Sequence, residues 1–199
     1  MATTKEQLAS LTTDMHVVTV DLKSIAPYSP SRMHFTPKLD RETADAYNER
    51  TWRNHAHVNP QGKVFIPGNC FLQSIRATAK HLSMQIPGKG KKTYTASFLS
   101  GVVCQNNIDL PLTLDDLEME QLYLPSDGVA GSGKRVVKRF PVITEWGGKL
   151  TFAILDPVIV EAVFREHMVR AGELKGVGRW RPAVGGMNGR FKVTAIDWQ

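Results

Sequence analysis

Six segments with the periodicity of regular secondary structure constrain the fold of this chain most strongly, because they follow one another in a recognisable order. In residues 15–25 apolar and polar side chains alternate, which predicts a strand with one apolar face formed by Val18, Val20, Leu22 and His16. The later segments are a helix over 67–83, a strand over 95–104, a strand over 150–155, a helix from 156 to 172 and a strand over 190–198. Strand, helix, strand, strand, helix, strand is the split βαβ arrangement. We therefore predict an α+β protein with a ferredoxin-like, RRM-like antiparallel sheet and two helices.

Local signals mark both helices. The first has apolar residues at helical spacing, namely Phe71, Leu72, Ile75, Ala79 and Leu82. For the second, Asp156 and Pro157 offer a capping acceptor and a proline at the first helical position, and we expect Gly172 to end it. Its expected buried side chains are Val160, Val163, Phe164, His167 and Ala171.

Two stretches interrupt this order. Residues 26–66 form a predicted helical insertion after the first strand, with a flexible proline-rich loop over 26–39 and a helix from Asp40 to about Ala56 in which Trp52 is buried. Residues 117–145 form a predicted protruding hairpin, because two extended arms flank the flexible sequence SDGVAGSGK. We expect residues 1–14 to be a flexible N-terminus and 15–199 to be a single domain.

The charge of the chain points to an anionic partner. The 199 residues carry a formal net charge of +6, and the cations gather in 86–92, 131–140 and 170–192, while acidic residues gather in 109–127. Cys70 and Cys104 lack metal-site spacing and are typical of a reduced compartment. The sequence has no long apolar run and no basic-then-apolar leader, so we expect a cytoplasmic protein with no membrane contact and no cofactor.

The glycine-rich stretch 172–190 is the first candidate site. Six of the chain's 16 glycines lie in it, interleaved with Lys175, Arg179, Trp180, Arg181 and Arg190. Glycine frees backbone N–H groups and guanidiniums bind phosphate oxygens, so this stretch predicts a phosphate cradle on which Trp180 stacks a base. The alternative is a mobile surface loop, with Trp180 in the core and Arg190 as a structural residue.

Further candidate cations lie outside this loop. In an extended hairpin arm Lys134 and Lys138 share one face and Arg135 and Arg139 share the other, so one face can touch nucleic acid and the other a neighbouring subunit. The alternative is a solvated charge run that protects a strand edge. Weaker candidates for phosphate contact are Arg32, Arg53 and Lys91.

The order of elements and the loop sequences GVGRWRP and GGMNGRF together resemble the RAMP superfamily, the repeat-associated proteins of CRISPR effector complexes. The resemblance implies an RRM-like fold, in which the hairpin is similar to the "thumb" and residues 27–66 occupy the place of the "palm" of subunits that coat guide RNA. This chain is shorter than such subunits, which implies a reduced, stand-alone relative, for example from a phage or another mobile element.

Histidines raise an enzymatic alternative. RAMP-type ribonucleases work without metal and use a side chain to deprotonate a 2′-hydroxyl. The resemblance therefore implies Tyr28, His34, His55 or His57 as candidates for this role. The sequence favours the alternative that His55 and His57 are ordinary surface or capping histidines, and we expect His16, His81 and His167 to pack on element faces. The GKGKK and GSGKR sequences lack P-loop spacing, so we do not expect nucleotide hydrolysis.

The resulting hypothesis is a non-catalytic protein that binds single-stranded RNA or DNA, with the sheet offering one face to the strand. It would act as a homo-oligomer along the strand or as a subunit of a larger ribonucleoprotein complex. The two alternatives are a metal-independent endoribonuclease and a protein that mimics an effector subunit.

Overall fold

The main sheet has the predicted ferredoxin-like topology. The computed structural model describes residues 15–126, 129, 131 and 133–199, so the predictions for residues 1–14 and for most of the hairpin tip lie outside the described residues. Four antiparallel strands are arranged in the order β4-β8-β1-β9. Their bounds are His16–Ser24 for β1, Val102–Cys104 for β4, Gly147–Ile154 for β8 and Phe191–Trp198 for β9.

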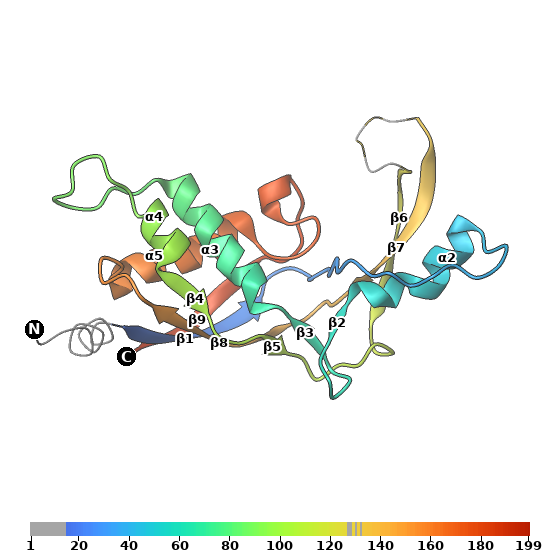
Figure 1. Cartoon of the computed structure of the whole chain (residues 1–199), viewed down its shortest axis with the longest axis horizontal. Coiled ribbons are helices and arrows are strands. Elements are labelled where there is room, and N and C mark those ends of the chain that lie inside the picture. Colours follow the sequence, from blue (N-terminus) through green and yellow to red (C-terminus); the bar gives the residue numbers. More distant parts are fainter. Residues whose placement is uncertain (1–14, 127–128, 130, 132) are drawn as a thin grey trace, which may run out of the picture.

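One face of this sheet carries the core. Three helices cover it, α3 (Gly68–Leu82), α4 (Thr95–Ser100) and α5 (Glu161–Arg170), as Figure 1 shows. Val18, Val20 and Leu22 alternate inward along β1 as predicted and are buried. They meet side chains that are also buried on β8, α3 and α5, namely Leu150, Phe152, Ile154, Phe71, Ile75, Phe164 and Met168. The periodicity of the segments therefore identified the core face correctly.

The predicted strand over 95–104 is wrong in its first half. Residues 95–100 form α4, because Tyr94, Ser97 and Phe98 lie at helical spacing and are all buried. Phe98 stacks on His167 of α5 with ring centroids 4.3 Å apart. This packing decides for a helix, and only Val102–Cys104 is extended.

Both predicted ends of α5 are also wrong. The Asp156 carboxylate accepts the N–H of Val158 and its carbonyl accepts the N–H of Ile159, so Asp156 stabilises a turn and the helix begins five residues later, at Glu161. At the other end the helix passes Gly172 and continues as a π-helical turn, Ala171–Lys175. Gly172 is needed for contact, since a Cβ there would lie 2.1 Å from the carbonyl oxygen of Phe191.

The insertion and the hairpin extend away from the core at one end of the molecule (Figure 1). The hairpin pairs β6 (Glu118–Pro125) with β7 (Arg135–Val142). The insertion contributes α2 (Ala44–Thr51), a 3-10 turn (Trp52–His55), β2 (His57–Val58) and β3 (Val64–Ile66), and β3 also pairs with β5 (Ile108–Asp109). The predicted bounds of this helix, Asp40 to about Ala56, are wrong: its cap is Thr43, whose hydroxyl accepts the N–H of Ala46, and its α-helical part ends at Thr51. Trp52 is buried as predicted.

Candidate nucleic-acid interface

The glycine-rich loop is folded tightly on itself and on the start of the insertion. The N–H groups of Val177, Arg179 and Gly189 donate to the carbonyls of Gly189, Ser29 and Pro27 respectively. A Cβ on Gly178 would lie 2.6 Å from the Tyr28 ring, and one on Gly189 would lie 1.8 Å from the Val177 carbonyl oxygen. The predicted cradle of free backbone N–H groups is therefore wrong at these positions, because the glycines serve close packing.

Arg179 faces the interior. Its Nε donates to the Ser29 hydroxyl at 3.0 Å, its Nη2 pairs with the Glu120 carboxylate, and its guanidinium lies 4.0 Å from the centre of the Phe140 ring. The side chain is only 15% exposed. Arg179 therefore fastens the glycine-rich loop to the hairpin, and its predicted contact with phosphate would require this contact to open.

Arg181, two residues later, faces outward. Its guanidinium donates one hydrogen bond, of 3.1 Å, to the Gly178 carbonyl and lines a cavity together with Lys175. Trp180 between the two arginines is 48% exposed and has a φ of 53°, so it is not a core residue. Arg190 donates to the Glu173 carbonyl at 3.0 Å.

Of the four hairpin cations, Arg139 and Arg135 have partners within the protein, whereas Lys134 and Lys138 make no such contact in the part of the chain that the structure describes. Arg139 pairs with Asp45 at 2.7 Å and with Glu49, and its N–H donates to the Asn48 side chain, so it holds α2 against β7. Arg135 donates to the Tyr123 carbonyl. Lys134 is exposed, whereas Lys138 lines a hollow beside the insertion.

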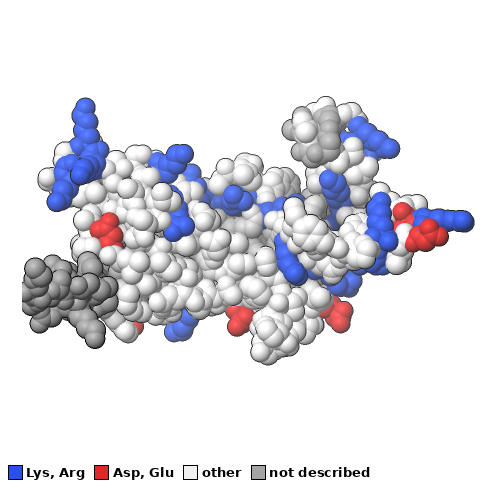
Figure 2. Space-filling model, in the orientation of Figure 1, with Lys and Arg blue, Asp and Glu red and all other residues white. Residues whose placement is uncertain are grey.

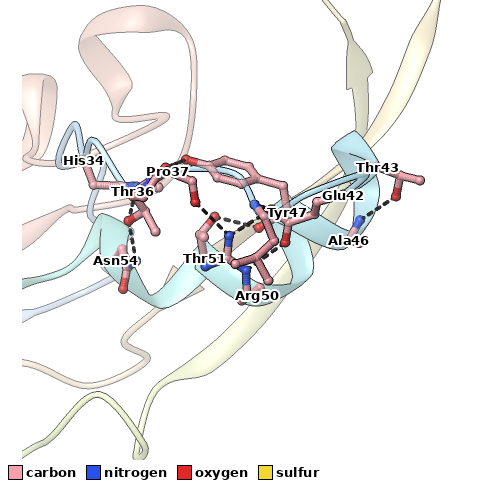
Figure 3. Close-up of polar contacts among 11 residues, drawn as sticks. His34, Thr36, Pro37, Glu42, Thr43, Ala46, Tyr47, Arg50, Thr51 and Asn54 are labelled. Atoms are coloured by element: carbon pink, nitrogen blue, oxygen red, sulfur yellow. Dashed lines mark hydrogen bonds and ion pairs between the residues drawn. The ribbon is translucent and has the colours of Figure 1, made fainter.

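The segment 31–39 is held in place, although its prolines predict a flexible loop. Figure 3 shows the Tyr47 hydroxyl donating to the Thr36 carbonyl at 2.8 Å and the Asn54 amide donating to the Thr36 hydroxyl at 2.9 Å. Arg50 donates to the Pro37 carbonyl at 3.0 Å while its guanidinium is paired with Glu42. The segment is irregular, as its prolines predict, and side chains of α2 and the following turn replace the missing strand partners.

This fixed segment exposes large apolar side chains among cations. Met33 is 76% exposed and Phe35 is 89% exposed, and Arg32 is exposed beside them. Sequence reasoning missed Met33 and Phe35, although their alternation with Arg32 and His34 was a usable signal. Exposed aromatic side chains next to cations are the side-chain types that stack and neutralise a nucleic-acid strand.

Three hollows join the loop, the insertion and the hairpin. The first lies among Tyr28, His57, α3 and the glycine-rich loop, and shares Ser31 with the second. The second is lined by Lys138 and Phe140 and shares Arg32, Met33 and His34 with the third. We call the three together the interface groove; its cationic lining residues are Lys175, Arg181, Arg32 and Lys138. In the view of Figure 2, many of the visible Lys and Arg side chains lie along the upper side of the molecule.

Of the predicted site residues, only Lys175, Arg181, Arg32 and Lys138 line this groove. Arg53 and Lys91 belong neither to the loop nor to the hairpin. The Arg53 guanidinium stacks on Trp52 at 4.3 Å and its Nε donates to the Leu114 carbonyl. Lys91 lies in the turn between α3 and α4, at the end of the molecule away from the hairpin (Figure 1). The structure thus brings the loop, the hairpin and Arg32 together, and leaves Arg53 and Lys91 apart from them.

The open face of the main sheet does not suit base stacking. Positions that alternate with the core residues on the described strands carry no aromatic side chain; they are Val17, Thr19, Asp21, Lys23, Val103, Lys149, Thr151, Ala153, Lys192, Ala195 and Asp197. Lys149 and Asp21 pair across this face at 3.3 Å. We expected this face to receive the strand, but it lacks the stacking side chains that RRM sheets use.

The histidines occupy three kinds of place. His34 and His55 meet in the groove with ring centroids 4.8 Å apart, and their Nδ1 atoms bond to the Thr36 hydroxyl and the Arg32 carbonyl. Burial, then the neighbouring His55 and Arg32, lower the pKa of His34 below its usual range. His167 is buried as predicted and His16 contacts Trp198, but His81 is exposed, so its predicted packing role is wrong.

Some site classes have no counterpart in the part of the chain that the structure describes. No three His, Cys, Asp or Glu side chains there gather as metal ligands. Over the same residues no helix has the length and apolar content that a bilayer crossing requires.

No protein-family model and no curated protein matches this chain. Solved structures similar to it include a chain of the type III-B Cmr-beta complex bound to cognate target RNA, with 11% identity and a TM-score of 0.46 over 98% of this chain and 63% of that one. Cmr6 from Pyrococcus furiosus has 14% identity and a TM-score of 0.42 over 92% of this chain and 100% of its own length. A chain of a CRISPR RNA-guided surveillance complex has 12% identity and a TM-score of 0.40, over 92% of this chain and 67% of that chain. This chain therefore spans less than two thirds of the Cmr-beta chain.

Proposed function

We propose that this chain binds single-stranded RNA or DNA along the interface groove and does not cleave it. The observation that carries this proposal is that the three hollows share lining residues, from the glycine-rich loop, across residues 31–36, to Lys138 on the hairpin. Cations line each of its three hollows, and Phe35 lies exposed on the third.

The lining favours a single strand over a duplex. Arg32, Lys138 and Arg181 can neutralise phosphates, and each such contact releases counterions, so binding weakens as salt rises. Phe35 and Trp180 present ring faces on which unpaired bases can stack, and a base in a duplex has no free face to offer them. Binding of this kind depends on the backbone and on stacking, so it is largely independent of sequence.

The proposal includes a RAMP-like place in a larger assembly. The glycine-rich loop precedes the last strand and the hairpin projects from the core, as the resemblance to guide-coating subunits implies. The partners would be the strand itself and either further copies of this chain or other subunits of a ribonucleoprotein complex. We also propose that this chain is a reduced, stand-alone relative of such subunits from a phage or another mobile element.

A binding titration tests the function. Labelled RNA and DNA of about 40 nucleotides, single- and double-stranded, are titrated at about 50 and about 200 mM salt. We expect Arg32→Ala/Arg181→Ala to weaken single-strand binding by more than about tenfold and to reduce the salt slope by about 1.4, or roughly 0.7 for each lost phosphate contact.

The matched control removes two cations from the opposite side of the sheet. Lys23 and Lys192 face each other across β1 and β9 on the open face, so Lys23→Ala/Lys192→Ala changes the net charge equally. Equal losses in both double variants would mean that only net charge attracts the strand, and the groove would be wrong as the site. No detectable single-strand binding by the wild-type protein would refute the function itself.

The contact between His34 and His55 favours one second candidate, a metal-independent endoribonuclease. Two imidazoles beside Lys138 and Tyr47 in one hollow can supply a general base and a general acid for attack by a 2′-hydroxyl. The same titrations decide between the two functions if RNA integrity is followed in the presence of a chelator. RNA cleavage that disappears in His55→Ala would replace the non-catalytic proposal, and intact RNA would support it.

A further inference from the structure

The hollow between α3 and the glycine-rich loop has the size of a small ligand. Its volume is about 280 Å³, close to the lower limit of about 300 Å³ for small-molecule pockets. A cavity of this size admits one base-sized planar group and excludes a folded peptide. It is lined by Tyr28, by Val177 and Gly178 of the glycine-rich loop, and by residues of α3 between Asn69 and Ala77.

The α3 wall carries the groups that read base edges. Asn69 and Gln73 lie one turn apart, both are exposed to the cavity side of the helix, and only a long contact of 3.4 Å joins the two amides. Each amide has donors and an acceptor to offer a ligand. Ser31 adds a hydroxyl from the insertion.

His57 completes the polar lining. It is half-buried, packs on Phe65 with ring centroids 5.4 Å apart, and lines the cavity opposite α3. Burial, and then the charge of Arg32, lower the pKa of His57, so the ring is neutral near pH 7. A neutral imidazole offers one donor and one acceptor, as a base edge requires, and adds no charge to the cavity floor.

The charged groups of the same cavity come from the glycine-rich loop. Lys175 and Arg181 belong to its lining, and Arg181 is exposed while one of its N–H groups is held by the Gly178 carbonyl. The neutral amides of Asn69 and Gln73 suit the base of a nucleotide, and the cations Lys175 and Arg181 suit its phosphate.

We propose that this cavity binds one unstacked adenine base of the strand, with the adjoining phosphate on Arg181 and Lys175. Adenine is the base that Asn and Gln amides pair through two hydrogen bonds, to N6 and N7. This inference rests on the proposed single-strand binding and adds one base-selective position to an otherwise sequence-independent groove.

Oligouridylates test the base preference. Oligomers of uridine that differ only in one central A, G or C compete for the protein, and we expect the single adenine to raise affinity roughly tenfold over uridine alone. The variant Asn69→Ala/Gln73→Ala should lose that advantage, so that its affinities for the adenine-containing oligomer and for plain oligouridylate agree within about twofold. The control Gln61→Ala removes an exposed amide outside the cavity and should keep the preference.

Several outcomes would overturn the adenine site: equal affinity for all four oligomers, a preference for guanine, or an adenine preference that survives in Asn69→Ala/Gln73→Ala. If no oligomer binds, the proposed function fails, and a titration with adenosine monophosphate then judges the cavity alone. Shifts in the side-chain amide NMR signals of Asn69 and Gln73 with this nucleotide, but not with inorganic phosphate, support the site. Unchanged amide signals would refute it.

Discussion

The core and the outer half of this molecule differ in how far polar contacts supplement apolar packing. In the core, apolar side chains from β1, β8, α3 and α5 pack with almost no exposure, as Phe71, Phe152 and Phe164 illustrate. The outer half consists of residues 26–66 and the β6–β7 hairpin. Its buried apolar side chains are Tyr28, Trp52, Ala56, Val64 and Ile66. Polar contacts of Arg50, Arg139, Arg179, Ser29 and Tyr28 add to this packing, within the outer half and towards the glycine-rich loop.

The difference teaches which part of the protein sets stability and which sets the shape of the groove. Apolar burial contributes the most to stability, so the core determines whether the chain folds. Hydrogen bonds and partly exposed ion pairs are individually weaker, but they are directional. They orient the hairpin and residues 31–36 relative to the glycine-rich loop, and so position the cations that we propose bind the strand.

The largest expected effect is in the core. Phe71 is fully buried and contacts Phe191 and Trp146 with ring centroids 5.4 and 6.0 Å away. Phe71→Ala leaves a cavity and should lower the free energy of unfolding by about 3–5 kcal/mol, measured by urea denaturation. Lys80→Ala, on the exposed side of the same helix, should change it by less than about 0.5 kcal/mol. A loss below about 1 kcal/mol for Phe71→Ala would mean that α3 does not form the core described here.

The sequence predicted those parts of the core that local patterns determine, and failed where contacts between distant residues decide. The alternation of Val18, Val20 and Leu22 is a local pattern, and so is the helical spacing of Phe71 and Ile75, so both faces were predicted correctly. The segment 95–100 failed because a short apolar run fits a strand or a helix equally well. Its conformation depends on Phe98 stacking on His167, which is a contact between distant parts of the chain.

The candidate site shows the same limit. The sequence identified the glycine-rich loop and its cations, but it gave no reason to treat Arg179 and Arg181 differently. Arg179 is internal because Glu120 and Ser29 approach it from 59 and 150 residues away. The exposure of Phe35 likewise depends on Tyr47 and Asn54 holding Thr36, which no local pattern encodes.

The second prediction concerns the seam between the two halves, where Gly178 packs on Tyr28 and Ser29. Gly178→Ala combines a left-handed backbone, with φ of 79°, and a Cβ placed 2.6 Å from the Tyr28 ring. We expect a loss of about 2–3 kcal/mol in unfolding free energy. Gly185→Ala is the matched control, because Gly185 has a φ of 81° and no neighbouring atom within 4 Å of its added Cβ. Equal losses in the two variants would show that the seam contact contributes nothing.

The third prediction tests the polar fastening directly. Arg179→Gln removes the ion pair with Glu120 and the stacking on Phe140, and should cost about 1–2 kcal/mol because the pair is largely shielded from water. Amide hydrogen exchange should accelerate in β6 and β7 and stay unchanged in β1 and β8. Arg165→Gln is the control, since its pair with Glu161 is about half exposed and should contribute about 0.5 kcal/mol or less. Uniformly faster exchange would mean that Arg179 supports the core and not the hairpin.

The smallest expected effect is on the pH dependence of stability. It concerns His167, a polar residue inside the apolar core. His167 is fully buried against Phe98, and its Nδ1–H donates to the Val163 carbonyl at 2.7 Å. Burial lowers the pKa of His167, so the folded state holds the neutral form while the unfolded state takes up a proton near pH 6.5. The stability that neutral His167 allows is therefore complete above that pH and is lost as the pH falls below it.

Thermal unfolding from pH 7.5 down to pH 5.5 measures this loss. His34 and His57 shift in the same direction and add to the slope of the wild-type protein. His167→Phe keeps an aromatic ring against Phe98 and should reduce the slope by no more than about 1.4 kcal/mol per pH unit, the limit for one proton. His81→Gln, at an exposed position of α3, is the control, and the slope of His167→Phe is compared with the slope of this variant. If His167→Phe keeps the full wild-type slope, the acid sensitivity belongs to the histidines of the groove, and the outer half is the part that responds to pH.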